Sequence, residues 1–327
     1  MSSKTDYLKL AGNIHLSYYL EAADELGIKS EVIVRSLMAK FTYKEKHWFI
    51  INTVLPVNNV PSSTIAKRKN LTYKVLNKHK IPVAEQLEAT EYKDALEFYK
   101  KHMNVVVKPV QNLGGKGVSI LPRTEDEFMM AYQHAEKNDK SKTKVNVLVE
   151  RFITGNNYRL LVCDNKVIGA VYRKPAAVIG DGIHSISDLI SIANQQRKDN
   201  LLMPILIDTE VAKCLALKDL TMDFTPQNGQ EILLRFNANL STGGTTEECL
   251  TQIDPYYLDL AVKASKTIGL KVAGVDLIAE DITKQDNCVI NEINYNPGLR
   301  VHYKVDKGDV YPVAVPIMHY IRDNYIS

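Results

Sequence analysis

The spacing of apolar side chains along the chain predicts helices and strands in mixed order. Near the start, apolar residues recur at helical spacing from 16 to 26, and Gly27 follows as a helix stop. The stretch 62–80 also has the pattern of a helix, whereas the apolar run 105–107 is typical of a buried strand. Thr124 stands three residues before a glutamate, which is a capping box that begins another helix.

Several of the later strand candidates occur in antiparallel pairs. Residues 159–163 and 166–172 are joined by an Asp-Asn pair that suits a tight turn. Residues 273–279 and 288–293 flank a short polar connection in the same way. Strands joined by short turns pair antiparallel, so the pattern predicts an α+β fold and not a doubly wound parallel one.

Composition and charge narrow the class of protein. The chain has 327 residues, which at roughly 150 residues per domain suggests about two domains. Lys and Arg number 41 and Asp and Glu 38, which is too even a balance for a nucleic-acid scaffold. No apolar run approaches the roughly 18 residues of a membrane helix, and the first ten residues do not have the pattern of a signal peptide. We therefore expect a cytoplasmic protein that binds neither nucleic acid nor membrane, with its four separated cysteines reduced.

A glycine-rich segment at 111–118 is the strongest candidate for a binding loop. It lies between the strand candidate 105–108 and a second short strand at 118–121. Glycine lets backbone N–H groups approach a phosphate closely, so the loop could be a hinged flap over a nucleotide. No Ser or Thr follows Lys116, which excludes a Walker A loop, and a following strand excludes a dinucleotide fingerprint. A plain hairpin remains the alternative.

Basic side chains supply a second set of candidates. Lys108 ends a buried strand beside the glycine-rich loop, where an ammonium is costly unless an anion pairs with it. Lys69 is a weaker candidate, because on the sequence alone a surface lysine is the better explanation. Four arginines near strand ends suit clamps for carboxylate or phosphoryl oxygens, with solvated surface residues as the alternative: Arg159, Arg173, Arg235 and Arg300.

Two carboxylates in apolar runs form a candidate metal site. If the last two strands make a hairpin centred on Lys284, paired positions sum to 568 and Asp276 lies opposite Glu292. Asn294 shares a face with Glu292 because it is two residues further along the strand. Facing carboxylates repel each other unless a cation lies between them, and oxygen ligands of this kind suit Mg²⁺. A solvated sheet face with two fortuitous acids is the alternative.

Taken together and in order, these motifs resemble the ATP-grasp ligases, and most of all the ATP-grasp module of cyanophycin synthetase and of bifunctional glutathione synthetase. The resemblance covers the chain from about Ile65 to its end. It is carried by short stretches at 106–110, 114–118, 149–155, 158–159, 173–176, 178–182, 237–244, 274–276, 291–294 and 296–298.

The resemblance implies a role for each candidate residue. Lys69 and Lys108 would hold the ATP phosphates beneath a flap made of Gly114, Gly115, Lys116, Gly117 and Val118. Glu150 would accept a hydrogen bond from the adenine amino group, with Phe152 and Ile153 at the adenine edge. The catalytic set would comprise Arg159, Arg235 and Arg300, of which the first two would stabilise the transferring phosphoryl group. The metal ligands would be Asp276, Glu292 and Asn294, holding two Mg²⁺ ions for which Mn²⁺ could substitute.

The resemblance also implies an architecture and a reaction. The expected fold is an ATP-grasp fold, with a short α/β region at 1–60, a lid subdomain with a linking helix at 61–150, and a large subdomain at 151–327 that carries the metal and substrate site. The expected reaction joins a carboxylate to an amine on an amino acid or short peptide, through an acyl phosphate. The sequence is compatible with a homodimer and does not fix the oligomeric state. Two alternatives stay open: a nucleotide-binding protein without catalysis, and a ligase that modifies a peptide or protein side chain.

Overall fold

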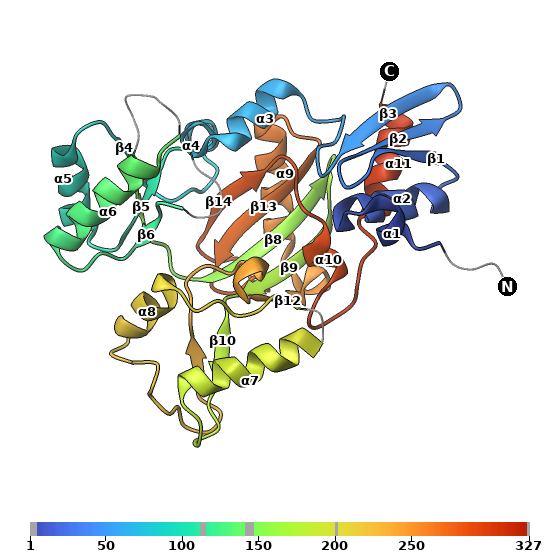
Figure 1. Ribbon diagram of the computed structural model, residues 1–327. Helices are drawn as coiled ribbons and strands as arrows, with labels where there is room; N and C mark the ends of the chain where they lie inside the picture. The colour runs from blue at the N-terminus through green and yellow to red at the C-terminus, as the bar shows by residue number, and fades with distance from the viewer. Residues whose placement is uncertain (1–4, 112–115, 141–146, 200–201, 326–327) are drawn as a thin grey trace.

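The computed structural model describes residues 5–111, 116–140, 147–199 and 202–325. Within these residues the strands form four sheets, with strand orders β1-β2-β3, β4-β7-β5-β6, β12-β9-β8-β13-β14 and β10-β11. Figure 1 shows the five-stranded sheet in the middle of the molecule, with the other three around it. All strand pairs in these sheets are antiparallel, which confirms the predicted α+β class.

Residues 5–55 and the C-terminal helix form one unit, here called the N-terminal module. Its elements are α1 (Tyr7–Ala11), α2 (Ile14–Glu25), β1 (Lys29–Val34), β2 (Met38–Tyr43), β3 (Lys46–Ile51) and α11 (Ala314–Asn324). Phe41 and Trp48 are buried in a core that also contains Ile317 and Met318 of α11. Chain segments almost 300 positions apart therefore share one apolar core.

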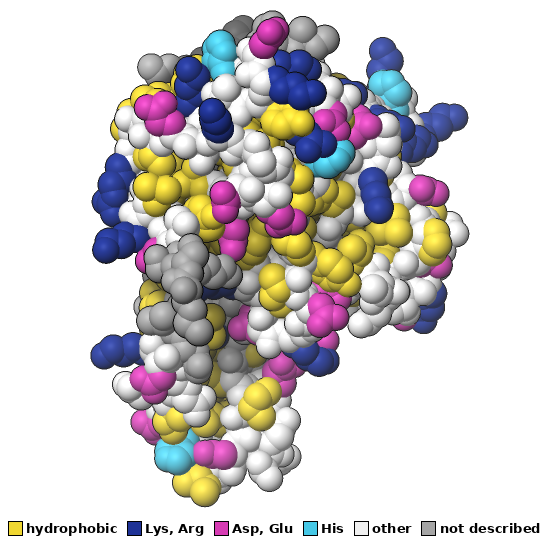
Figure 2. Space-filling model, turned by 90° about the vertical axis from the view of Figure 1, so that its right-hand side faces the viewer, with side chains coloured by type: hydrophobic (Ala, Val, Ile, Leu, Met, Phe, Trp, Pro, Cys, Tyr) yellow, Lys and Arg dark blue, Asp and Glu magenta, His cyan; other side chains and the backbone are white. Residues whose placement is uncertain are grey.

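The sheet of the N-terminal module is covered on one side only. Along β3, Trp48 and Ile50 are buried, whereas the alternate residues Phe49 and Ile51 are 42% and 43% exposed. This alternation follows from the two-residue period of a strand. Figure 2 shows the side of the molecule that is on the right in Figure 1, where hydrophobic side chains are visible at the surface among charged ones.

Two helices lead from this module into the rest of the chain, α3 (Val60–Lys67) and α4 (Lys69–Lys78). The single helix predicted over 62–80 is therefore wrong, because Arg68 has an extended backbone with φ −110° and ψ 108°. The Ile65 carbonyl accepts hydrogen bonds from the Arg68 N–H at 3.0 Å and from the Thr72 hydroxyl at 3.0 Å. These two hydrogen bonds stabilise the junction between the helices, and the second helix begins at Lys69.

The four-stranded sheet carries two helices on one face (Figure 1). Its elements are β4 (Gln86–Ala89), α5 (Tyr92–His102), β5 (Val105–Pro109), β6 (Ser119–Ile120), α6 (Glu125–Asn138) and β7 (Val147–Arg151). Tyr99 and Phe128 stack at 4.5 Å between the helices. The predicted cap is confirmed, because the Glu127 N–H donates to the Thr124 hydroxyl at 3.1 Å and the Glu127 carboxylate accepts from the Arg123 N–H at 2.7 Å.

The five-stranded sheet supplies the largest core. Its elements are β8 (Asn156–Cys163), β9 (Lys166–Lys174), β12 (Thr245–Glu248), β13 (Val272–Ala279) and β14 (Cys288–Asn294), with α9 (Pro255–Ile268) packed on one face. Both predicted hairpins are present, β8 with β9 and β13 with β14. Ala66 of α3 and Leu76 of α4 also belong to this core, so the two linking helices are anchored on the large sheet.

A smaller unit projects from this sheet, at the bottom of Figure 1. It consists of β10 (Ala177–Ile179), α7 (Ile186–Asp199), α8 (Thr209–Ala216) and β11 (Glu231–Leu233), and has its own buried cluster. The short helix α10 (Arg300–Tyr303) follows β14 in the chain. All four cysteines are buried and unbridged. Among the described helices, none is both long and apolar enough to cross a bilayer.

Candidate functional site

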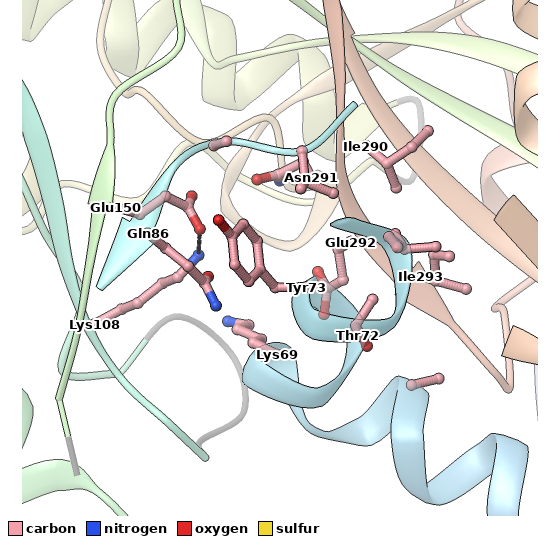
Figure 3. Close-up of a pocket in the computed structure, with 14 residues that line it drawn as sticks. Lys69, Thr72, Tyr73, Gln86, Lys108, Glu150, Ile290, Asn291, Glu292 and Ile293 are labelled. Atoms are coloured by element: carbon pink, nitrogen blue, oxygen red, sulfur yellow. Dashed lines mark hydrogen bonds and ion pairs between the residues drawn. The ribbon is translucent and has the colours of Figure 1, made fainter. Parts of the chain in front are cut away.

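A pocket lies between the four-stranded sheet and the five-stranded sheet, with α4 along it (Figure 3). One wall comes from Gln86, Lys108 and Glu150, and the opposite wall from residues 290–293 of β14. The helix α4 contributes a face of residues at helical spacing: Lys69, Thr72, Tyr73 and Leu76. Four of the residues predicted from the sequence thus meet in one cavity: Lys69, Lys108, Glu150 and Glu292.

Lys108 and Glu150 form the most enclosed ion pair on this wall. The Lys108 Nζ atom is 2.6 Å from Glu150 Oε2, and the two side chains are 8% and 13% exposed. Sheet register explains the approach, because Glu150 lies opposite Val106, two residues before Lys108 on the same face of β5. Glu150 therefore neutralises the lysine that we expected to hold phosphate, and a bound nucleotide would share both groups.

Lys69 begins α4 and points toward the same space (Figure 3). Burial is the main cause that lowers the pKa of Lys69 below its ordinary value of 10.5, and the nearby Lys108 ammonium lowers it further. Glu292 and Glu150 act in the opposite direction. In the described part of the chain Lys69 makes no ion pair, so its charge, unlike that of Lys108, has no carboxylate partner.

The predicted pairing of the two acids is confirmed. Asp276 lies opposite Glu292 and Gly274 opposite Asn294, as a sum of 568 requires. Beyond Asp276 the register shifts by one residue, because a bulge leaves Asn291 without a partner. Asp276, Glu292 and Asn294 consequently share one face of the sheet, and of these three Glu292 lines the pocket.

Asp276 is not an open ligand, because two arginines hold it. Arg159 donates to both of its carboxylate oxygens, with Nη2 2.9 Å from Oδ2, and Arg173 Nη2 is 3.0 Å from Oδ2. Burial by itself would raise the pKa of Asp276, but the two guanidinium groups bring it below its ordinary value. Asp276 is 4% exposed, so the three charges form one nearly closed network beside the pocket.

The side chains of this face include oxygen donors of the types that a divalent cation takes. Within the described residues Glu292 has no ion-pair partner, and Asn294 uses only its Nδ2 atom, which donates to the Gly274 carbonyl at 3.4 Å. Two carboxylates and one amide oxygen are the donor types that Mg²⁺ prefers. No group of three or more His, Cys, Asp and Glu side chains suited to a metal occurs in the described ranges, so the amide would be an essential member of the set.

The flap and the expected adenine edge are only partly described. β5 and β6 pair with Val107 opposite Ser119, which confirms two strands joined by the glycine-rich loop. Gly114 and Gly115 lie outside the described residues; Lys116 is exposed and Val118 is half-buried. Gly117 has φ +77°, and a Cβ there would stand 2.7 Å from the Cβ of Asn138, so only glycine fits.

Phe152 and Ile153 follow β7 but do not line the pocket. The Phe152 ring is half-buried and meets Phe236 edge-on with centroids 6.4 Å apart. The Phe152 N–H donates to the Asn104 carbonyl at 2.9 Å, which fixes the chain at this point. Their assignment to the adenine edge stays a prediction.

Two of the predicted arginines lie elsewhere. Arg235 is 2% exposed and is paired with Asp208 at 2.6 Å and Glu210 at 2.7 Å, next to the small unit of β10 and β11. Arg300 begins α10, where its charge lies near His15 of the N-terminal module and helps burial to lower the pKa of that histidine. Neither arginine lines the pocket, and both catalytic roles stay predictions.

Sequence reasoning missed four residues at or near this site. Tyr73 could have been found, because it is one helical turn after Lys69. Gln86 and Asn291 carry no local signal, since only sheet pairing brings them to the cavity. His302 of α10 is buried, and its pKa is lowered to about 3 by burial and by the charges of the two arginines on Asp276. It is therefore a neutral neighbour of that network.

Comparisons with known proteins agree with this geometry. The RimK-like ATP-grasp domain family matches residues 213–320, and the ATP-grasp (A) domain of phosphoribosylglycinamide synthetase matches residues 67–172. Cyanophycin synthetase of Crocosphaera subtropica is 37% identical over 222 residues, covering 65% of this chain and 25% of that protein. The glutathione biosynthesis bifunctional protein GshAB of Mannheimia succiniciproducens is 34% identical over 256 residues, covering 74% and 33%.

A solved structure extends the likeness to almost the whole chain. The crystal structure of a bifunctional glutathione synthetase from Pasteurella multocida superposes with a TM-score of 0.68 at 26% identity, covering 95% of this chain and 44% of that one. The chain spans about a quarter to a third of the length of the curated relatives it matches. On the two domain matches, these relatives and the shared architecture, the chain belongs to the ATP-grasp superfamily.

Proposed function

We propose that this protein is an ATP- and Mg²⁺-dependent ligase that joins a carboxylate to an amine. The observation that carries the proposal is the meeting of Lys69, Lys108 and Glu292 in one pocket between two sheets, with Asp276 directly opposite Glu292. Cations on one side and oxygen ligands on the other are what a metal–triphosphate complex needs. The relatives named synthetases support the same reaction class.

In the proposed reaction a substrate carboxylate oxygen attacks the γ-phosphorus of ATP, and the bond to ADP breaks. The nitrogen of the second substrate then attacks the acyl carbon, phosphate leaves, and the nitrogen loses a proton, which gives an amide. No covalent bond to the protein is required, so catalysis rests on positioning and charge neutralisation. Lys69 and Lys108 would neutralise phosphate oxygens from one side of the pocket.

Asp276, Glu292 and Asn294 would hold Mg²⁺, which when bound supplies further neutralisation of the phosphoryl oxygens. Among the described residues the Glu292 carboxylate has no ion-pair partner and Asn294 uses only its Nδ2 atom, whereas Asp276 would have to share its oxygens with the arginines. Arg159 and Arg173 would then be released in part toward a substrate anion or the acyl phosphate. In this proposal both Arg159 and Arg173 would stabilise that anion beside the metal.

The proposed substrates are an amino acid or a short peptide, as the names of the glutathione and cyanophycin relatives suggest. A ligase acting on a peptide or protein side chain is the nearest variant. A nucleotide-binding protein without catalysis is favoured by one observation, the closed network of Asp276 with two arginines. The experiments below separate these functions.

The direct test is a phosphate-release screen of the full chain with ATP, Mg²⁺ and pairs of amino acids or γ-glutamyl dipeptides, with mass detection of products. The proposal predicts phosphate release that depends on both substrates, and a product lighter by one water than their sum. The Glu292→Gln variant is the matched control, because it removes one ligand oxygen and keeps the shape. ATP binding without release for any pair would favour the non-catalytic protein.

A further inference from the structure

Gln86 is a buried hydrogen-bond donor that nothing in the described chain satisfies. It is the first residue of β4 and lines the pocket. Its side-chain Nε2 atom is shielded from solvent and has no hydrogen-bond partner among the described residues. A buried donor without an acceptor costs free energy, and in native proteins such a group calls for an explanation.

Strand register aims Gln86 at the proposed phosphate lysines. Gln86 lies opposite Glu150 of β7, and Glu150 lies opposite Val106 of β5. Directly paired residues point to the same side of a sheet, so Gln86, Glu150 and Lys108 emerge on one face. Figure 3 shows the Gln86 amide and the Lys69 ammonium pointing into the same space.

The balance of donors and acceptors around this space is unequal. On one side of the pocket Lys108, Lys69 and Gln86 contribute N–H donors, and the Glu150 carboxylate beside them already accepts from Lys108 at 2.6 Å. The Glu292 carboxylate is on the opposite wall, where the proposed function assigns it to the metal. Lys69 has no ion-pair partner in the described residues. A ligand that satisfies these donors must bring several acceptor oxygens and negative charge, as a phosphate group does.

We propose that Gln86 donates a hydrogen bond from Nε2 to a phosphate oxygen of the nucleotide held by Lys69 and Lys108. This inference rests on the proposed function, and adds a binding residue that the sequence motifs do not contain. A neutral amide suits the place, because a third cation would be repelled by the two lysines and a carboxylate would repel the phosphate.

The test measures binding of ATP and of adenosine to the full chain by calorimetry with Mg²⁺ present. Gln86→Met keeps the length of the side chain and removes the donor, and should weaken ATP binding about tenfold or more while adenosine binding stays within twofold. Gln86→Glu should weaken ATP binding further. Glu88→Gln is the matched control, since Glu88 lies on the same face of β4 but outside the pocket, paired with Lys74.

Two results would overturn the role of Gln86: unchanged ATP affinity in Gln86→Met, or equal weakening of ATP and adenosine, which would place the amide at the base. Absence of ATP binding to the wild-type protein would instead overturn the proposed function, and this inference with it. The fluorescence of Trp48, the single tryptophan of the chain, checks that each variant is folded. If Gln86→Met does not fold, Gln86→Asn, which retracts the amide, takes its place with the same expected split between ATP and adenosine.

Discussion

Replacing Lys108 by methionine should weaken ATP binding and also lower the free energy of unfolding, and the two effects can be measured separately. The side chain keeps its length and loses its charge, and with it the bond of 2.6 Å to Glu150. A charge-assisted hydrogen bond to phosphate is worth about 1.5–3 kcal/mol, so ATP affinity should fall about 10- to 150-fold. Lys108 is on β5, one of the two strands that flank the glycine-rich loop, so the phosphate would lose the ammonium on that side of the pocket.

The same change should lower the free energy of unfolding. Removing one member of a buried ion pair costs about 3–5 kcal/mol, because the remaining charge stays buried without a partner. The two side chains are 8% and 13% exposed, which places the expected loss near the lower limit of that range. In the double variant Lys108→Met with Glu150→Gln the buried charge is absent, so at least half of the lost stability should return while ATP binding stays weak.

Calorimetry with ATP and urea unfolding of the wild type, both single variants and the double variant form one thermodynamic cycle. An ATP affinity of Lys108→Met within twofold of the wild type would remove Lys108 from the nucleotide site. A double variant no more stable than Lys108→Met would refute the account of the ion pair. ATP affinity and the free energy of unfolding are measured independently, so the phosphate contact and the ion pair are each tested separately.

Three further predictions address the metal face, the second lysine and the N-terminal module. Glu292→Gln should abolish phosphate release with little loss of stability. Asp276→Asn should also destabilise the fold by about 3–5 kcal/mol, because two buried guanidinium groups lose their counter-charge. Equal urea midpoints for the two variants would contradict this difference in stability. The pKa of Lys69 is below 10.5 because of burial first and of the Lys108 charge second, so ATP affinity should fall as pH rises through that lowered value. The free energy of unfolding should rise over the window up to 10.5, because the unfolded lysine binds its proton more tightly. In Lys69→Arg the loss of affinity over this window should disappear, and its persistence in pH-resolved calorimetry would assign it to another group. Trp48→Ala, at a side chain 1% exposed, should cost about 3–5 kcal/mol, and a loss under 1 kcal/mol in thermal unfolding would show that the module is not coupled to the rest.

The parts of the fold that the sequence predicted well are those whose signals are local. The β13–β14 hairpin was predictable because two apolar strands flank a charged turn, and the register followed as far as Asp276. The bulge at Asn291 was not, since nothing in its neighbours marks the extra residue. The break at Arg68 was also missed, because no glycine or proline marks it in the sequence and only the backbone shows it.

The N-terminal module was predicted only in part. The helix over 16–26 was identified, but the hairpin of β2 and β3 was not, although its alternation of buried and open residues is regular. Its core depends on α11, which comes more than 260 residues later, so no local reading could show what the strands pack against. Packing between segments that are far apart in the sequence determines this core, and no pattern in the residues around β2 and β3 indicates it.

The same distinction between local sequence signals and long-range contacts applies to the site. The pairing of Asp276 with Glu292 was predicted correctly, because pairing rules limit which strand residues can face each other. Lys69, Lys108 and Glu292 line one pocket, and their roles there stay predictions. The surroundings of Arg235 could not be foreseen, since the acids that hold it, Asp208 and Glu210, precede it by a long loop and α8. A long flexible side chain can reach a partner in many directions, and only the tertiary structure selects one.

The most direct test of the central claim compares wild-type protein with Glu292→Gln in one assay, phosphate release with ATP, Mg²⁺ and a substrate pair, followed by mass detection. The account predicts one phosphate released for each amide formed by the wild type, and neither from the variant although it is folded and binds ATP. Release that is equal in the two proteins, or that needs no amine, would contradict a ligase built around the carboxylate pair of β13 and β14.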